Sequence, residues 1–332
     1  MAKSVKTAVI GAGVAGLVAA RELRKEGHKV TVFEKSSKIG GTWVYDPRIE
    51  SDPISIDPTR EVVHSSLYLS LRTNLPRDLM GFSDYPFSVR ENGDLRNYPG
   101  HEEFLLFLND FVRNFEITEL IRFNSEVVGV ERVGSGNGGW SVEFKNKSGS
   151  SETEIFEAVL ICNGHHTIPV LANHSGMEKW KGKQIHSHNY RVPKPFLDQI
   201  VVMIGNGPSG IDISKEIATV AKEVHLSSRS PDTKIAKLEG HHNMWQHSDI
   251  ECVDNERGIV LFKDGSSVHP DIIFHCTGYK YDFPFLRTNG VVAVDDNRVG
   301  PLYKHVFAPE FAPSLSFLAL PTRVGTIFGL VK

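Results

Sequence analysis

Two stretches of the sequence combine residue types and spacing that suit nucleotide binding. VIGAGVAG at 9–16 and MIGNGPSG at 203–210 both place three glycines in a G-x-G-x-x-G frame directly after a short apolar run. Such a loop opens a helix, and its backbone amides can hold a pyrophosphate. The sequence therefore predicts two dinucleotide sites, the first at Gly11, Ala12, Gly13, Val14, Ala15 and Gly16, the second at Gly205, Asn206, Gly207, Pro208, Ser209 and Gly210.

The residue that follows the next strand distinguishes the two predicted sites. Glu34 lies 23 positions beyond Gly11, where a carboxylate can accept from ribose hydroxyls. The same spacing from Gly205 reaches Ser228, which is followed by Arg229. A carboxylate repels a 2′-phosphate, whereas a hydroxyl beside a guanidinium can donate to it and neutralise its charge. The second site is therefore predicted to prefer NADPH.

Hydrophobic periodicity predicts the elements that must position these loops. An apolar strand is expected at 7–10, a helix at 14–26 and a second strand at 29–33, which together form one β-α-β unit. A strand at 200–204, followed by a helix that carries Ile211, Ile213 and Ile217, repeats this pattern. The glycine loops thus stand where a nucleotide-binding fold needs them.

Composition excludes several other classes of protein. A length of 332 residues favours two domains, and a net charge of −3 without a run of Lys or Arg disfavours nucleic acid or an anionic membrane as partner. Cys162, Cys252 and Cys276 form no C-x-x-C pair, which argues against a disulfide framework, a zinc site or a redox dithiol. With neither a signal-peptide pattern nor an apolar stretch long enough to span a membrane, we expect a cytoplasmic protein.

The residues after the first strand pair resemble a known flavin-binding sequence. Glu34 and Lys35 are followed by Gly40-Gly41-Thr42-Trp43. An acid that is shortly followed by paired glycines is similar to the FAD signature of flavoproteins with two dinucleotide sites. This resemblance implies FAD at the first loop, with Lys35, Gly41, Thr42 and Trp43 among the residues that bind it.

A second resemblance extends over most of the chain. Trp180, Gly182, His186 and Tyr190 match the identifying sequence Phe-x-Gly-x-x-x-His-x-x-x-Tyr/Phe of the flavin-containing monooxygenases, with Trp in place of the first Phe. The stretches LRTNLPR at 71–77, RNYPGHEEFLLFLNDF at 96–111, CNGHH at 162–166 and CTGYKYDFPFL at 276–286 also resemble this family. Within the family, the sequence is most similar to the plant group that includes the glucosinolate S-oxygenases.

The family resemblance implies a reaction. The expected activity is an NADPH-consuming, FAD-dependent monooxygenase that transfers one oxygen atom of dioxygen, through a C4a-hydroperoxyflavin, to a small soft nucleophile. Thioether sulfur is expected, for example in methylthioalkyl glucosinolates, and amine nitrogen is the alternative. Asn74 falls on the family position beside the reactive edge of the flavin and is the predicted catalytic residue.

The predicted fold class is α/β, with two dinucleotide-binding Rossmann-like domains and the NADPH domain inserted into the FAD domain. The expected division is 1–167 for the first part of the FAD domain, 168–277 for the NADPH domain and 278–332 for the return segment. Family members continue past a strand expected at 318–320 into a helical segment, whereas this sequence ends in GTIFGLVK. We therefore expect a shortened product of the family.

Three other functions share features with this hypothesis. A pyridine-nucleotide disulfide reductase shares the two-loop plan, but it needs a redox dithiol that the cysteine spacing does not provide. A nucleotide-binding remnant without catalysis, or an NADPH oxidase that releases only hydrogen peroxide, stays an alternative.

A metal site is not predicted. His186 and His188 would share one face of a strand, but the sequence places no third ligand nearby, and His186 already belongs to the identifying sequence.

Overall fold

The computed structural model describes residues 3–134, 138–230 and 232–320. The chain forms two compact units. Unit 1 comprises the chain up to Val44, Leu71–His165 and the part from Tyr281 onward, and unit 2 comprises Tyr45–Ser70 and His166–Lys280. Residues 45–70 thus pack with unit 2, although the sequence-based division assigns them to the first domain. The domain boundaries stay a prediction, because a compact packing unit need not coincide with a nucleotide-binding domain.

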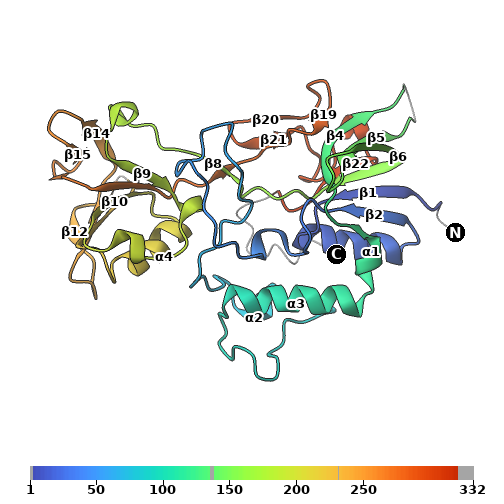
Figure 1. Cartoon of the computed structure of the whole chain (residues 1–332), viewed down its shortest axis with the longest axis horizontal. Coiled ribbons are helices and arrows are strands. Elements are labelled where there is room, and N and C mark those ends of the chain that lie inside the picture. Colours follow the sequence, from blue (N-terminus) through green and yellow to red (C-terminus); the bar gives the residue numbers. More distant parts are fainter. Residues whose placement is uncertain (1–2, 135–137, 231, 321–332) are drawn as a thin grey trace. The chain divides into compact units, whose positions relative to one another are not determined.

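The main sheet of unit 1 is parallel throughout (Figure 1). Its order is β22 (Leu315–Phe317), β7 (Ala158–Ile161), β1 (Lys6–Ile10), β2 (Lys29–Phe33) and β3 (Ile121–Arg122). Helix α1 (Val14–Lys25) connects β1 to β2, as the sequence predicts. The strand expected at 318–320 is wrong by three residues, since pairing with β7 ends at Phe317. Parallel strands are buried on both faces, which explains their apolar sequences.

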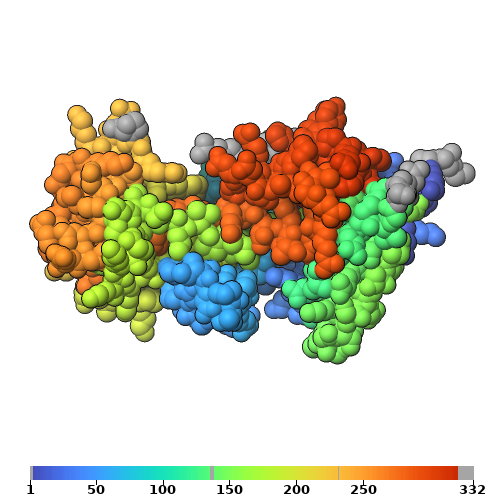
Figure 2. Space-filling view, turned by 90° about the horizontal axis from the view of Figure 1, so that it is seen from above, coloured from blue at the N-terminus to red at the C-terminus, as the bar shows by residue number. Residues whose placement is uncertain are grey.

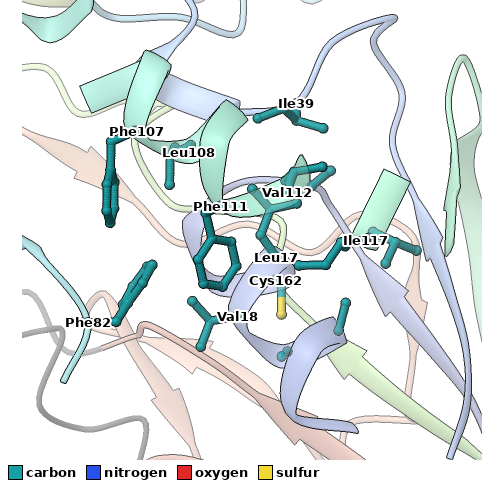
Figure 3. Close-up of a cluster of buried hydrophobic side chains, with 14 of the residues drawn as sticks. Leu17, Val18, Ile39, Phe82, Phe107, Leu108, Phe111, Val112, Ile117 and Cys162 are labelled. Atoms are coloured by element: carbon teal, nitrogen blue, oxygen red, sulfur yellow. The ribbon is translucent and has the colours of Figure 1, made fainter. Parts of the chain in front are cut away.

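Helix α3 (His101–Asn114) covers α1 on the side away from the sheet (Figure 1). Its apolar residues recur at helical spacing and form one buried stripe. Figure 3 shows Phe111 of this stripe beside Leu17 and Val18 of α1, while Phe107 faces Phe82. The helix that carries the first glycine loop is therefore packed between two layers.

The remaining described elements of unit 1 are a second sheet, a hairpin, a short helix and three 3-10 turns. A four-stranded sheet contains β19 (Leu286–Arg287), β4 (Glu126–Arg132), β5 (Trp140–Lys145) and β6 (Ser151–Phe156). The others are the hairpin β20 (Ala293–Asp295) and β21 (Arg298–Gly300), helix α2 (Arg77–Met80), and the 3-10 turns Gly41–Trp43, Ile117–Leu120 and Pro309–Phe311.

The main sheet of unit 2 repeats the plan of unit 1. Its order is β12 (Ala236–Lys237), β13 (Met244–His247), β11 (Glu223–Ser227), β10 (Ile200–Ile204), β17 (Ile272–His275) and β9 (Lys183–His186). All strands except β12 run parallel, and α4 (Pro208–Ile217) connects β10 to β11. β10, β11, β13, β17 and β9 correspond in position to β1, β2, β3, β7 and β22. Each glycine loop thus lies after a central strand of a parallel sheet.

Smaller elements complete unit 2. They are the sheet of β14 (Ile250–Asp254), β15 (Ile259–Phe262) and β16 (Ser267–Val268), the pair β8 (Ile168–Pro169) and β18 (Tyr279–Lys280), and the 3-10 turns Met177–Lys179, Ser187–Asn189 and Lys194–Phe196. Among the described residues, no helix has the length and apolar character needed to cross a membrane.

Candidate nucleotide-binding sites

Close backbone packing explains the outer glycines of the first loop. Gly11 has a φ of 105°, and a Cβ there would lie 2.6 Å from the carbonyl oxygen of Cys162. A Cβ on Gly16 would lie 1.9 Å from the carbonyl oxygen of Gly11. Any side chain at either position would collide with the backbone, so the turn between β1 and α1 requires both glycines.

Backbone packing does not explain why the middle position of the loop, Gly13, is a glycine. A Cβ on Gly13 would meet only the Cα of Gly41, at 3.8 Å, which is an ordinary contact. Gly13 is also the N-cap of α1, and it has no side chain to accept from the amides of the first turn, Val14, Ala15 and Gly16. These donors need an acceptor from outside the helix. The loop therefore fits a pyrophosphate, which would lie against Gly13.

Glu34 fastens the first loop to the end of β2. Its carboxylate is 7% exposed. Oε2 accepts from the amide of Ala12 at 2.8 Å, and Oε1 accepts from the amide of Ser36 at 2.8 Å. Each carboxylate oxygen has a further lone pair, so a ribose hydroxyl can still donate to it. The bonds to Ala12 and Ser36 are a structural role that the sequence did not reveal. The neighbouring Lys35 is exposed.

The segment from Gly40 to Trp43 packs against the same loop. The amide of Gly40 donates to the carbonyl oxygen of Ala12 at 2.9 Å. Gly41 and Thr42 are half-buried in the following 3-10 turn, and the ring of Trp43 lies 4.5 Å from that of Phe104. The second of the paired glycines thus allows close approach to the loop, since a Cβ on Gly41 would lie 3.1 Å from the Cα of Gly13.

The second loop reproduces the first in detail. Gly205 has a φ of 108°, and its Cβ would lie 2.5 Å from the carbonyl oxygen of Cys276. A Cβ on Gly210 would lie 2.0 Å from the carbonyl oxygen of Gly205. A Cβ on Gly207, the N-cap of α4, would meet nothing within 4 Å. Asn206, Gly207, Pro208 and Ser209 are exposed, so the helix N-terminus is open to a second nucleotide.

Ser228 and Arg229 lie at the end of β11. Ser228 is 6% exposed, and its amide donates to the carbonyl oxygen of His247 at 3.1 Å. Its Oγ accepts from the amide of Ser230 at 3.2 Å, which leaves the hydroxyl proton available for a phosphate oxygen. Arg229 is exposed beside it. Their chemistry suits a 2′-phosphate.

Asn74 lies on an exposed bend of unit 1. Two backbone hydrogen bonds hold the bend, from the amide of Thr73 to Pro99 at 2.9 Å and from the amide of Arg77 to Asn97 at 3.0 Å. The side chain of Asn74 is therefore presented from a fixed backbone.

Two residues of the identifying sequence, His186 and Tyr190, lie in the interior of unit 2, whereas Trp180 is half-buried and Gly182 is exposed. A Cβ on Gly182 would lie 2.6 Å from Nε1 of Trp180, so the indole requires glycine there. His186 is completely buried and Tyr190 is 1% exposed. Burial lowers the pKa of His186 to about 3, which keeps the imidazole neutral. The residue types of the identifying sequence thus have packing roles within unit 2.

The expectation that His186 and His188 share a strand is wrong. β9 ends at His186, and His188 lies in the turn Ser187–Asn189. Nδ1 of His188 lies 2.9 Å from Oγ of Ser66, and Nε2 lies 3.2 Å from Oε1 of Glu50. Within 3–134, 138–230 and 232–320, no group of three His, Cys, Asp or Glu residues is arranged to hold a metal ion.

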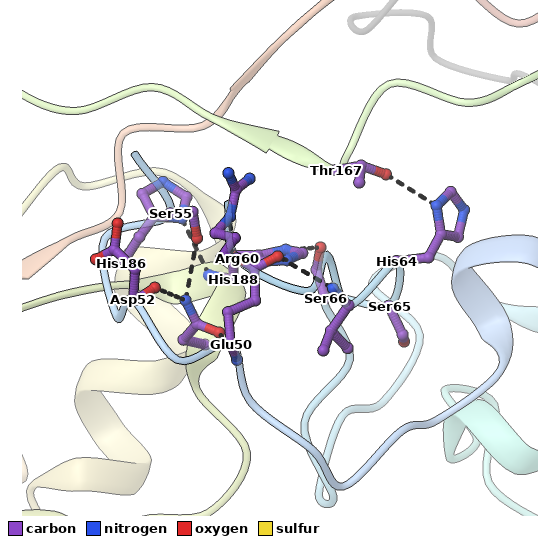
Figure 4. A network of polar contacts seen from close by, with 12 residues as sticks. Glu50, Asp52, Ser55, Arg60, His64, Ser65, Ser66, Thr167, His186 and His188 are labelled. Atoms are coloured by element: carbon purple, nitrogen blue, oxygen red, sulfur yellow. Dashed lines mark hydrogen bonds and ion pairs between the residues drawn. The ribbon is translucent and has the colours of Figure 1, made fainter. Parts of the chain in front are cut away.

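A buried polar network holds residues 45–70 in unit 2 (Figure 4). Glu50 is 3% exposed and accepts from Nε of Arg60 at 2.6 Å and from the amide of Val63 at 3.1 Å. The amide of Glu50 donates to Oδ1 of Asn189 at 2.9 Å. In Figure 2 this segment, in blue, lies against yellow-green residues of the same unit. Sequence reasoning missed the network because the segment has no periodic pattern.

Two parallel-sheet units, each with a glycine loop at a helix N-terminus, define a protein of the two-dinucleotide class. The sequence profile of the flavin-binding monooxygenase-like family matches residues 3–247 and 247–332. The chain belongs to this family.

Individual relatives agree with the family. The chain is 59% identical to flavin-containing monooxygenase FMO GS-OX-like 7 of Arabidopsis thaliana over 96% of its own length and 69% of the relative. It is 57% identical to FMO GS-OX5 of the same plant, over 96% and 70%. The solved structure of S-allyl-L-cysteine S-oxygenase from Allium sativum is 54% identical and superposes with a TM-score of 0.95, covering 99% of this chain and 74% of that one.

These findings confirm several predictions from the sequence. The family, the α/β fold with two Rossmann-like domains and the enzyme class are as expected. The chain is a flavin-binding monooxygenase, so the expected flavin cofactor is confirmed. Its reaction partners are accordingly a small-molecule substrate and dioxygen.

Proposed function

We propose that this protein oxygenates the sulfur of small thioethers, with FAD held at the loop Gly11–Gly16 and NADPH bound at the loop Gly205–Gly210. The observation that carries the assignment of the loops is the contrast between Glu34 and Ser228–Arg229 at equivalent strand ends. The similarity to S-allyl-L-cysteine S-oxygenase and to the GS-OX proteins supports sulfur as the acceptor atom.

The chain contributes binding and orientation to the first site. The amides at the N-terminus of α1 donate to the pyrophosphate, where the helix dipole adds favourable charge. Glu34 accepts from the ribose hydroxyls with the lone pairs that Ala12 and Ser36 leave unused. Lys35 and the Gly41–Trp43 turn would contribute further contacts to the same cofactor.

In the second site, the amides at the N-terminus of α4 take the corresponding role for NADPH. Ser228 donates its hydroxyl proton to the 2′-phosphate, and Arg229 neutralises it with a charge-assisted hydrogen bond. A carboxylate is absent from this strand end in the sequence, so the additional phosphate meets no repulsion there.

Bound FAD would supply the redox chemistry, by accepting electrons from NADPH and activating dioxygen, of which one oxygen atom goes to sulfur and the other leaves as water. Asn74 is proposed to lie beside the reactive edge of the flavin. Its amide can donate and accept hydrogen bonds but provides no acidic proton, so it orients polar atoms without protonating them early.

The test measures NADPH consumption and sulfoxide formation in the same reaction, with S-allyl-L-cysteine, methylthioalkyl glucosinolates and an amine as candidate substrates. We expect one sulfoxide for each NADPH with a thioether, and none without it. NADPH consumption that yields only hydrogen peroxide with every substrate would identify an uncoupled oxidase and refute the proposal. A purified chain that retains no FAD would identify a remnant.

A further inference from the structure

The helix of the second loop carries two carboxylates that the proposed reaction does not use. Asp212 and Glu216 stand four positions apart on α4 and therefore lie on one face. Ile213 and Ile217 occupy a different face and are buried. The carboxylates thus lie outside the apolar contact that joins α4 to its sheet.

Two tyrosines from other segments of unit 2 meet these carboxylates. The hydroxyl of Tyr68, which is 6% exposed, donates to Oδ2 of Asp212. Burial, and then the carboxylate of Asp212, raises the pKa of Tyr68 well above its usual range, so the phenol keeps its proton. Burial, followed by Glu216, raises the pKa of Tyr190 in the same way. The two tyrosine rings pack edge to face, with centroids 5.4 Å apart.

The second tyrosine–carboxylate pair, Tyr190 and Glu216, is not joined by a hydrogen bond of good geometry. The hydroxyl of Tyr190 and Oε2 of Glu216 are both buried and interact closely enough for Glu216 to raise the pKa of Tyr190. The directional connection between the tyrosines and α4 therefore runs through Tyr68 and Asp212.

Tyr68 is itself held by a fixed backbone. The amide of Leu69 donates to the carbonyl oxygen of Arg191 at 2.9 Å. Nη2 of Arg191 donates to the carbonyl oxygen of Ser65 at 3.0 Å, and Nη1 donates to that of His188 at 2.7 Å. Tyr68 thus joins α4 to a rigid part of the same unit.

The hydrogen bond between Tyr68 and Asp212 lies close to the second loop. Asp212 lies one turn beyond Pro208, the first residue of α4, whose N-terminal amides are proposed to bind the pyrophosphate. Apolar packing against a sheet is non-directional, whereas a hydrogen bond to a charged acceptor fixes both distance and angle. A small displacement of α4 would move every donor at its N-terminus.

We propose that Tyr68, acting through Asp212, is a positioning residue that sets α4 for binding of the NADPH pyrophosphate. This inference rests on the proposed assignment of NADPH to the second loop. Tyr68 does not touch the reacting atoms, so it influences binding of the reductant rather than the oxygenation step.

The central test is the variant Tyr68→Phe, which removes one hydroxyl and keeps the ring. We expect the KM for NADPH to rise about ten-fold, as for loss of a hydrogen bond to a charged group, with kcat and FAD content unchanged. Asp212→Asn keeps an acceptor for the phenol, so its KM for NADPH should rise less than that of Asp212→Leu. The double variant Tyr68→Phe/Asp212→Leu should bind NADPH no more weakly than Asp212→Leu alone.

Tyr98→Phe is the matched control, because Tyr98 is 45% exposed and lies in unit 1; its KM should equal that of the parent protein. A parent-like KM for Tyr68→Phe would overturn the inference, as would additive effects in the double variant. If Arg229→Gln raises the KM but Tyr68→Phe does not, only this inference fails. If neither variant changes the KM, the assignment of NADPH to the second loop fails with it.

Discussion

Ser228 occupies in unit 2 the position that Glu34 occupies in unit 1. The last residues of β1 and β2 are paired in register, and so are the last residues of β10 and β11. Glu34 and Ser228 each follow directly. One position therefore holds a buried carboxylate in the first unit and a hydroxyl next to an exposed guanidinium in the second. The same fold thus presents opposite charge at the two equivalent strand ends.

The first prediction concerns Arg229. Arg229→Gln removes the positive charge from the 2′-phosphate, and we expect the KM for NADPH to rise by roughly 10- to 100-fold, since hydrogen bonds to charged groups contribute about 1.5–3 kcal/mol. The KM for NADH, which lacks this phosphate, should not change. Steady-state kinetics with both reductants is the measurement. Arg257→Gln, another exposed arginine of unit 2, is the control, and an equal loss with both reductants would contradict the prediction.

The second prediction separates two glycines of one loop. Gly207→Ala adds a Cβ that meets no atom of the protein, so thermal stability should stay unchanged while the KM for NADPH rises about ten-fold. Gly210→Ala places a Cβ 2.0 Å from the carbonyl oxygen of Gly205 and should cost about 3 kcal/mol of folding free energy. Thermal unfolding and NADPH kinetics on both variants check this. Comparable loss of stability in the two would show that Gly207 is also a packing residue.

The third prediction concerns Glu34. Two amides donate to its carboxylate, and Glu34→Gln offers only one acceptor oxygen. The backbone amide left without an acceptor should lower the free energy of unfolding by about 1–3 kcal/mol. The displaced loop should also retain less FAD. Urea unfolding and the ratio of flavin to protein absorbance are the measurements. The exposed Glu26→Gln is the control, and full FAD content in Glu34→Gln would count against this role.

The fourth prediction is a dependence of stability on pH. Burial lowers the pKa of His186 to about 3 and those of His247 and His275 to about 4, from an ordinary value of 6.5. Below about pH 6.5 the unfolded chain binds protons that the folded chain does not, so stability is complete above this pH and is lost as the pH falls toward 4. For three histidines the slope reaches at most about 4 kcal/mol per pH unit.

Urea unfolding at pH 7.5, 6 and 5 measures this slope. His275→Gln removes one titrating group and should reduce the slope by at most about 1.4 kcal/mol per pH unit, whatever its effect on stability at pH 7.5. A free energy of unfolding that stays constant between pH 7.5 and 5 would contradict the assignment.

Glycine spacing and apolar periodicity were sufficient to predict the two β-α-β units. β2 and β10 have the predicted bounds, and α1 ends one residue before the predicted end. These elements are encoded locally, because a strand, a tight turn and an amphipathic helix each depend on residues a few positions apart. Counting along the second strand also located Ser228, since parallel pairing fixes the register.

The sequence by itself thus determined the family, the two glycine loops and the difference in charge between them. Only the tertiary structure decided that residues 45–70 pack in unit 2, that Glu34 ties its loop to β2, and that Tyr68 reaches Asp212. These contacts join residues that are distant in sequence and follow no period. They depend on which buried donors and acceptors must be paired once the sheets have formed, and only the folded chain brings those groups together.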